Sequence, residues 1–405
     1  MHPRRGAVWL LYAYAASLPV QVSVAPELRL APADAFLVIY LVLFGARDLL
    51  RSPDRRLWHP WHLAFALTIV QGLLVAVWFD GRASFGAVVN KGLGAGVLLA
   101  GYLFVASTVA DEPTLRRVLR IFVRASAVCA GASLAAFFWP VPLLAGVLNG
   151  NGFRLSGTMP DPNQFGSVLL VAAALAWFAE PRRALRVALL LVLVVAIFFT
   201  YSRSTFIGAG IALVVWTLRV KGVRRLVPVA ATGVILYVLA GGALLGTASE
   251  AMLARERTVD ARVEVLRAGM DMFERSPLVG IGLGRFAQAE VVGEPIIVHN
   301  TPAWFLVEFG VVGFLMFSLF VADVSFRALR PSVLTDTDLS AGLLSAHLAM
   351  LACSLGIEAF YQRHWWLVVA LSGAAYAMGR HPHRRWLGAG VLRDPGPAPS
   401  RQVAR

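Results

Sequence analysis

The sequence predicts an all-α polytopic membrane protein. Hydrophobic residues make up 58% of the 405 positions and the mean hydropathy is +0.69, well above the range of soluble globular proteins. Apolar stretches of about 17–25 residues, the length of a transmembrane helix, recur along almost the whole chain. The arginines gather in alternate connecting segments, as expected when short cytoplasmic loops are basic.

The apolar stretches, taken in chain order, predict about twelve transmembrane helices and one large loop near 248–300. The predicted spans lie near 7–24, 33–50, 62–79, 85–109, 118–139, 164–180, 184–200, 203–219, 225–247, 302–325, 340–360 and 364–380. The run after MHPRR is also compatible with a signal peptide ending at AYA, but so many later spans favour a retained first helix. In the large loop, apolar residues at helical spacing predict short helices lying on the outer surface.

A cytoplasmic N-terminus places most of the 37 basic residues inside the cell. The positive-inside rule then favours an even number of spans with both termini in the cytoplasm. The basic tail 381–405, rich in Pro and Gly, is predicted to be disordered. The net charge of +14 therefore reflects topology, and nucleic-acid binding is disfavoured. The basic residues that fall elsewhere are Arg29, Arg82, Lys91, Arg154, Arg203, Arg363 and six arginines of the large loop.

The segment VHNTPAWFLVEFG, residues 298–310, places a histidine just before a predicted span. Thr301 is a good N-cap and Pro302 suits the first helical position. His299 should therefore lie at the membrane–water boundary, over the positive end of a helix dipole. That placement favours a neutral imidazole and attracts anions, as a base beside a phosphorylated lipid requires.

Three further segments should share this outer face. In NGFRLSGTMPDPNQFG, residues 151–166, the pair Asp161 and Pro162 signals a helix start and puts Asn163 in the first turn. In TYSRSTFIG, Arg203 lies at the turn between two apolar runs. The fourth segment is residues 260–286 of the large loop. Three helix N-termini together with arginines form an anion site that needs no metal.

Each of these residues also has a plainer interpretation. Arg203 could snorkel to the interface, and Arg262 and Arg267 could hold a surface helix on anionic headgroups. Glu308, two turns into a span, needs a partner and is predicted to be structural. The glycines of GIGLG, 280–284, resemble a phosphate loop, but no strand precedes them and no Lys-Ser/Thr follows. Lys91, within an apolar span, is a functional candidate.

Taken in order, RLSGTMPDPN, YSRS, PLVGIGLGRF and HNTPAWFLVEFG resemble the O-antigen ligase and O-antigen polymerase superfamily of bacterial membrane glycosyltransferases. The resemblance covers most of the chain in hydropathy, and its motifs cover about 154–166, 200–208 and 260–313. It implies a metal-independent, inverting transferase without a cofactor, acting in the bacterial inner membrane on the periplasmic face. The donor would be a glycan on undecaprenyl pyrophosphate. Residues 1–380 would form the membrane glycosyltransferase domain, with the loop near 248–300 in the periplasm.

The resemblance also implies roles for individual residues. Arg203 and Arg262 correspond to arginines associated with the pyrophosphate, and His299 corresponds to a histidine associated with activation of the acceptor. Leu266 stands where the family often has an aromatic residue, which is a departure from its pattern. The expected substrate-binding residues are Arg154, Asn163, Arg267 and Asn300.

Two acceptors are compatible with this chemistry. A ligase passes the glycan to lipid A–core, whereas a polymerase passes it to another lipid-linked glycan. The single large loop and the number of spans favour the ligase. A transporter or flippase of lipid-linked glycans is the alternative of a different class, and it predicts helices broken near the membrane midplane and an internal repeat. The sequence shows no repeat, and its polar residues cluster at one surface.

Overall fold

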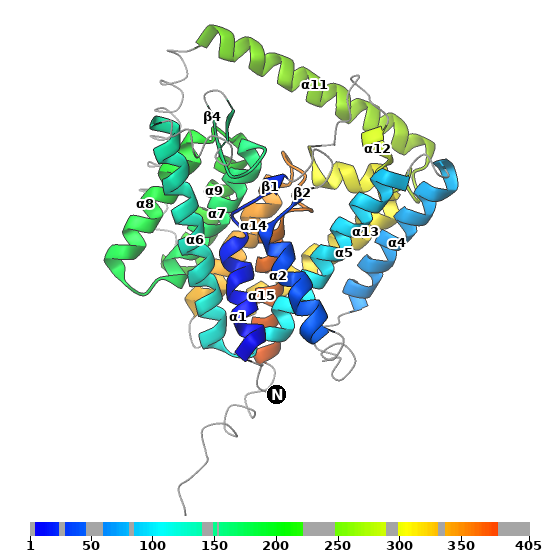
Figure 1. The fold of residues 1–405 in the computed structure, drawn as a ribbon. Coiled ribbons are helices and arrows are strands. Elements are labelled where there is room, and N and C mark those ends of the chain that lie inside the picture. Colours follow the sequence, from blue (N-terminus) through cyan, green and yellow to red (C-terminus); the bar gives the residue numbers. More distant parts are fainter. Residues whose placement is uncertain are drawn as a thin grey trace, which may run out of the picture.

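The computed structural model describes residues 5–23, 29–45, 60–80, 85–139, 149–151, 154–221, 248–288, 299–330 and 337–379. These residues are mostly helical, as predicted, and form a bundle with one long helix across one end (Figure 1). The long helices are α1 Arg5–Ser17, α2 Pro32–Tyr40, α4 Pro60–Asp80, α5 Phe85–Thr108, α6 Glu112–Phe138, α7 Pro162–Ala179, α8 Arg183–Phe199, α9 Arg203–Trp216, α11 Ala248–Arg275, α13 Thr301–Leu329, α14 Thr337–Cys353 and α15 Arg363–Gly379. The shorter elements are the π-helical turns Leu41–Gly45 and Thr217–Lys221, helix α12 Arg285–Gln288, and strands β1 Val22–Ser23, β2 Arg29–Leu30, β3 Asn149–Asn151 and β4 Arg154–Gly157.

Four helical segments of the described chain are long and apolar enough to cross a membrane. They are Lys91–Thr108, Glu112–Phe138, Pro162–Ala179 and Thr301–Leu329, and shorter apolar helices occur at Pro32–Gly45, Leu63–Phe79 and Leu339–Cys353. The protein is therefore a multi-pass membrane protein by length and composition, and the number of twelve spans stays a prediction. The predicted span near 225–247 and the tail 381–405 lie outside the described residues.

The connecting segments predicted to be external meet at one end of the bundle. The hydroxyl of Thr158, after β4, donates to the carbonyl of Pro19, after α1, at 2.6 Å. The amide of Thr301, at the start of α13, donates to the carbonyl of Ser354, after α14, at 2.7 Å. Helix α11 lies across this same end (Figure 1).

The prediction of short helices in the large loop is wrong, because residues 248–275 form the single helix α11. Val265, Met272 and Phe273 give that helix one apolar stripe against the rest of the protein. No proline or capping sequence interrupts the stripe before Ser276 and Pro277, so the helix continues to Arg275.

Several predicted helix boundaries also differ from the structure. Helix α1 ends at Ser17, not near 24, and residues Val22–Ser23 form strand β1. Helix α6 begins at Glu112, earlier than predicted, because the Asp111 carboxylate caps its first turn. The cap of α13 is Asn300, one residue before the predicted Thr301. Helix α14 ends at Cys353, not near 360, because turns at 354–361 interrupt the helical pattern and present their carbonyls to α13.

Helix α13 is broken at Gly310, where φ is 68° and ψ is −168°. This backbone conformation is essentially restricted to glycine. The amides of Ile281 and Gly282 donate to the carbonyls of Val307 and Glu308, both at 3.0 Å. The segment before α12 therefore satisfies carbonyl groups that the break removes from the helical pattern.

The backbone amide that follows the break in α13 also binds this segment. The amide of Val311 donates to the carbonyl of Pro277 at 2.8 Å. A Cβ on Gly280, whose φ is +73°, would lie 2.4 Å from the backbone of Glu308 and Phe309. Glycine is thus required here by both conformation and space.

Candidate active site

The segment from Ser354 to Gln362 lies between the first turns of α13 and α9. The amide of Thr301 donates to the carbonyl of Ser354, and the Thr301 hydroxyl donates to the carbonyl of Ile357 at 3.0 Å. The adjacent Cys353 thiol donates to the carbonyl of Ser204 at 3.3 Å. The N-terminus of α13, next to His299, and the N-terminus of α9, next to Arg203, therefore flank the same segment.

Glu358 anchors this segment to α5. Its carboxylate pairs with Lys91, whose ammonium lies 4.4 Å from the centre of the Tyr361 ring. The Tyr361 hydroxyl donates to the carbonyl of Lys91 at 3.0 Å. Lys91, a functional candidate by sequence, thus has a carboxylate partner within the protein.

His299 is half-buried and immediately precedes the capping residue of α13. Burial is the main cause that lowers the pKa of the imidazole, and the nearby positive charge of Arg262 lowers it further. Asp161 and Glu358 act in the opposite direction, but the net shift is downward. The neutral imidazole predicted from sequence is therefore favoured in the free protein.

Arg154 links three of the predicted outer segments. From β4, its Nε donates to the carbonyl of Thr200 at 2.9 Å, and its terminal nitrogen donates to Asn163 Oδ1 at 2.9 Å. Burial lowers the pKa of Arg154; Asp161 opposes this shift, and Arg262 adds to it. An arginine nevertheless stays charged at neutral pH. The side chain thus lies within electrostatic range of α11 and of the helix starts at α7 and α9.

Polar side chains cap the starts of α7 and α13, as predicted. The cap of α7 is Asp161, and the cap of α13 is Asn300 in place of the predicted Thr301. The Asp161 carboxylate accepts the amides of Asn163 from both its backbone and its side chain, at 2.9 Å. Asn300 Oδ1 accepts the amide of Ala303 at 3.0 Å, and its Nδ2 donates to the carbonyl of Leu355. Both asparagines, expected to bind substrate, have partners within the protein.

Arg203 opens α9 directly after a tight turn. Tyr201 takes the left-handed conformation with φ of 48°, and the Ser202 hydroxyl caps the helix by accepting the amide of Thr205. Arg203 is exposed, as are Arg262 and Arg267 on α11. His299 and Arg154 both lie within electrostatic range of Arg262, and Arg203 opens α9, which flanks the same segment as His299.

Glu308 is buried, with 1% of its surface exposed. Its carboxylate accepts the amide of Gly284 at 2.8 Å, while its backbone carbonyl accepts the amide of Gly282. The amide of Leu283 donates to the carbonyl of Gly72 at 2.9 Å. The amides of the GIGLG segment thus bind protein groups, which argues against a phosphate loop.

The sequence analysis did not place Glu358 and Asp161 near the candidate site. In the structure, both carboxylates act electrostatically on His299. Glu358 lies in SLGIEAFYQRH, which the predicted span near 340–360 largely absorbed. A local signal could have revealed Glu358. The residues Gly356, Glu358 and Gln362 interrupt the apolar run, and a membrane span disfavours charged and polar side chains. Asp161 was recognised only as a helix-start residue.

Residues 187–318 match the family model described as O-antigen ligase. The matched segment contains Arg203, Arg262 and His299, together with the break in α13. This match supports the O-antigen ligase superfamily and confirms the resemblance seen in the sequence motifs. The likeness to O-antigen ligases covers 132 of the 405 residues, from 187 to 318. No curated protein matches the chain.

Proposed function

We propose that the protein is an O-antigen ligase that transfers a glycan from undecaprenyl pyrophosphate to a sugar hydroxyl of lipid A–core. The observation that carries the proposal is the placement of His299, whose pKa is lowered, within electrostatic range of Arg262 at one end of the bundle. The protein would lie in the bacterial inner membrane with this end in the periplasm and both termini in the cytoplasm. The match to the O-antigen ligase family supports the same reaction class.

In the proposed reaction, Arg203 and Arg262 bind the pyrophosphate of the donor. A guanidinium donates two parallel hydrogen bonds to phosphate oxygens and stabilises the charge that develops on the leaving group. The N-termini of α9 and α13 add partial positive charge at the same end. This electrostatic stabilisation requires no metal and no cofactor.

His299 acts as the general base. Its neutral imidazole removes the proton of the acceptor hydroxyl, and the resulting oxygen nucleophile attacks the anomeric carbon of the donor glycan. The bond from that carbon to the pyrophosphate oxygen breaks, and undecaprenyl pyrophosphate leaves. A single displacement inverts the anomeric configuration.

The remaining residues hold this arrangement or contact substrate. Arg154 joins β4 to the starts of α7 and α9, and Asn163 receives one of its hydrogen bonds. Asn300 fixes the first turn of α13 directly beside His299. We assign Arg154, Asn163, Asn300 and Arg267 to the substrate-binding region and Glu308 to a structural role.

A polymerase that joins lipid-linked repeat units is the second candidate, because it would use the same donor and because the sequence motifs resemble ligases and polymerases alike. A transporter is less well supported. Its predicted broken helix is present in α13, but the carbonyls of Val307 and Glu308 and the amide of Val311 bind the segment before α12. The break is thus filled by protein, whereas a transport site needs polar backbone groups that can bind its substrate.

The test uses the purified full-length protein in liposomes with a lipid-linked glycan donor. Lipid A–core or a second lipid-linked glycan is supplied as the acceptor in separate reactions. The ligase proposal expects one glycan joined to lipid A–core. A ladder of lipid-linked products without lipid A–core product would establish the polymerase, and translocation without a new glycosidic bond would establish the transporter.

A further inference from the structure

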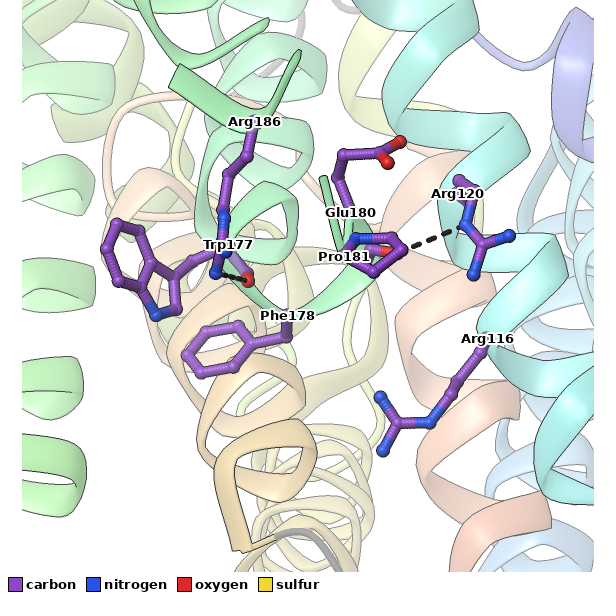
Figure 2. A pocket seen from close by; sticks show the side chains of 8 residues that line it. Arg116, Arg120, Trp177, Phe178, Glu180, Pro181 and Arg186 are labelled. Atoms are coloured by element: carbon purple, nitrogen blue, oxygen red, sulfur yellow. Dashed lines mark hydrogen bonds between the residues drawn. The ribbon is translucent and has the colours of Figure 1, made fainter. Parts of the chain in front are cut away.

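A cavity of about 270 Å³ lies among the ends of α6, α7 and α8 that point away from α11 (Figure 1, Figure 2). Its lining residues are Arg116, Arg120, Trp177, Phe178, Ala179, Glu180, Pro181 and Arg186. Figure 2 shows Arg116 and Arg120 reaching into this region from α6 and Arg186 reaching into it from α8. The cavity belongs to the end of the bundle that the arginine distribution predicts to face the cytoplasm.

The cavity carries excess positive charge. The Glu180 carboxylate, the only acidic group among the described residues that line it, accepts two hydrogen bonds from Arg124, at 2.9 and 2.5 Å. Burial raises the pKa of Glu180, but the hydrogen bonds from Arg124 and from the Arg182 amide outweigh burial and lower it. Glu180 is therefore ionised and neutralised by an arginine outside the lining. Arg116 pairs with Glu112 at 2.9 Å.

Arg120 and Arg186 keep unused hydrogen-bonding capacity. Arg120 donates through Nε to the carbonyl of Ala179 at 3.3 Å, which leaves the two terminal nitrogens of its guanidinium without a hydrogen bond to the described residues. Arg186 donates through one terminal nitrogen to the carbonyl of Trp177 at 3.0 Å, and its Nε is buried without a partner among the described residues. The Arg186 guanidinium carbon lies over the ring of Trp177, 4.6 Å from the ring centroid.

The surrounding residues are of the kinds that proteins place at a membrane interface. Trp177 packs edge to face against Trp216, and aromatic residues of this kind concentrate where a membrane meets water. From the Arg186 end, α8 continues with Val187, Leu191 and Val194, which lie on one face and are exposed by 55, 64 and 40%. The basic cavity and the apolar stripe thus begin at consecutive residues of α8, Arg186 and Val187.

We propose that this cavity binds the phosphate headgroup of an anionic membrane lipid, with the acyl chains along the apolar stripe of α8. Two guanidinium groups with unused N–H groups match the oxygens of a phosphate. Basic pockets between transmembrane helices on the cytoplasmic side are suited to anionic lipid headgroups. The volume lies just below the range of about 300–1,000 Å³ for pockets that enclose a whole small ligand, so it fits a headgroup and leaves the chains outside.

The test measures lipid binding to the full-length protein by native mass spectrometry. Phosphatidylglycerol and phosphatidylcholine with the same acyl chains are titrated separately, and inorganic phosphate is added as a third probe. We expect phosphatidylglycerol to bind at least about tenfold more tightly than phosphatidylcholine, a difference of about 1.4 kcal/mol. The double variant Arg120→Gln, Arg186→Gln should lose this preference. The matched control is Arg219→Gln, an exposed arginine in the π-helical turn Thr217–Lys221 after α9 and outside the cavity lining, and it should retain the preference.

Equal binding of the two lipids, or full retention of the preference in the double variant, would overturn the proposal. Arginine-dependent binding of inorganic phosphate without binding of phosphatidylglycerol would also overturn it, since the site would then take a free anion. A second measurement needs no variant: photoactivatable phosphatidylglycerol should label α8 preferentially in the wild-type protein. Labelling spread evenly over all the apolar helices would count against the assigned stripe.

Discussion

Two non-helical segments contact α13, and they use their polar groups in different ways. The segment Pro277–Gly284 fills the break at Gly310, and its amides from Ile281 to Gly284 all donate to protein acceptors. The segment Ser354–Gln362 holds the start of α13, contains the carboxylate of Glu358 and lies beside the helix starts that carry His299 and Arg203. The first segment has little left with which to bind a ligand, whereas the second positions groups that can act on one.

The largest expected effect at the Ser354–Gln362 end comes from His299→Ala. The variant loses the proposed base, so turnover should fall roughly 100- to 10,000-fold. Binding of the lipid-linked donor should persist, because the arginines bind the pyrophosphate. Turnover is measured with purified protein, and donor binding is measured separately.

Two outcomes for His299→Ala would contradict the proposed base. Loss of donor binding would place the histidine in the anion site. Transfer at the normal rate would show that another group, or none, activates the acceptor hydroxyl.

Arg203→Lys should be nearly as damaging as Arg203→Ala. Lysine keeps the charge but loses the planar fork that binds two phosphate oxygens. Loss of one such contact should cost about 3–4 kcal/mol of transition-state stabilisation. Arg219→Lys, at an exposed position at the opposite end, is the control. Full transfer activity in Arg203→Lys at normal protein levels would rule out the bidentate role.

The pH dependence tests the same end of the molecule. The neutral imidazole is the proposed active form, so kcat/KM should rise with pH and level off above the pKa of His299. Because burial and Arg262 lower that pKa, the midpoint should lie below the ordinary value of about 6.5. Below the midpoint, kcat/KM should fall about tenfold per pH unit. A midpoint well above the ordinary value, or an unchanged limb in His299→Ala, would assign the titration to another group.

Gly280→Ala tests the segment that fills the break. The added methyl would lie 2.4 Å from the backbone of Glu308 and Phe309, at a residue whose φ is +73°. The strain should destabilise the protein by about 1–3 kcal/mol or more, as measured by thermal unfolding in detergent. Gly210→Ala is the matched control, because no atom lies within 4 Å of its added Cβ in α9. It should be neutral or stabilise by up to about 1 kcal/mol. Equal stability of the two variants would show that the close approach is not needed.

The sequence predicted the helical class and the order of most helices because membrane burial imposes long apolar runs. It also predicted that the segments around Arg154, Arg203 and His299 lie at one end, because alternation of spans fixes which connections share a face. The continuity of α11 and the turn after Cys353 depend on tertiary contacts, and hydropathy does not report these contacts.

The partners of single polar residues could be predicted only in part. Asp161 was recognised as a helix start because the signal is local. The pairing of Lys91 with Glu358 joins residues far apart in the chain, so neither residue alone reveals it. The break in α13 was missed for the same reason: GIGLG fits against Gly310 only in the folded chain.

The smallest expected effect is that of Glu308→Gln. This variant tests whether the segment Pro277–Gly284 has only a structural role, in contrast to the segment Ser354–Gln362. Glu308 lies in α13 nine residues beyond His299, and its carboxylate accepts the amide of Gly284 at 2.8 Å. A glutamine oxygen can accept the same hydrogen bond, so the variant should keep most of the transfer activity and lose about 1 kcal/mol of stability. Glu308→Leu leaves that amide unpaired and should be less stable than Glu308→Gln when unfolding and activity are measured side by side. A stable Glu308→Gln protein with no activity would place the carboxylate in the mechanism, and the segment that fills the break would then belong to the site.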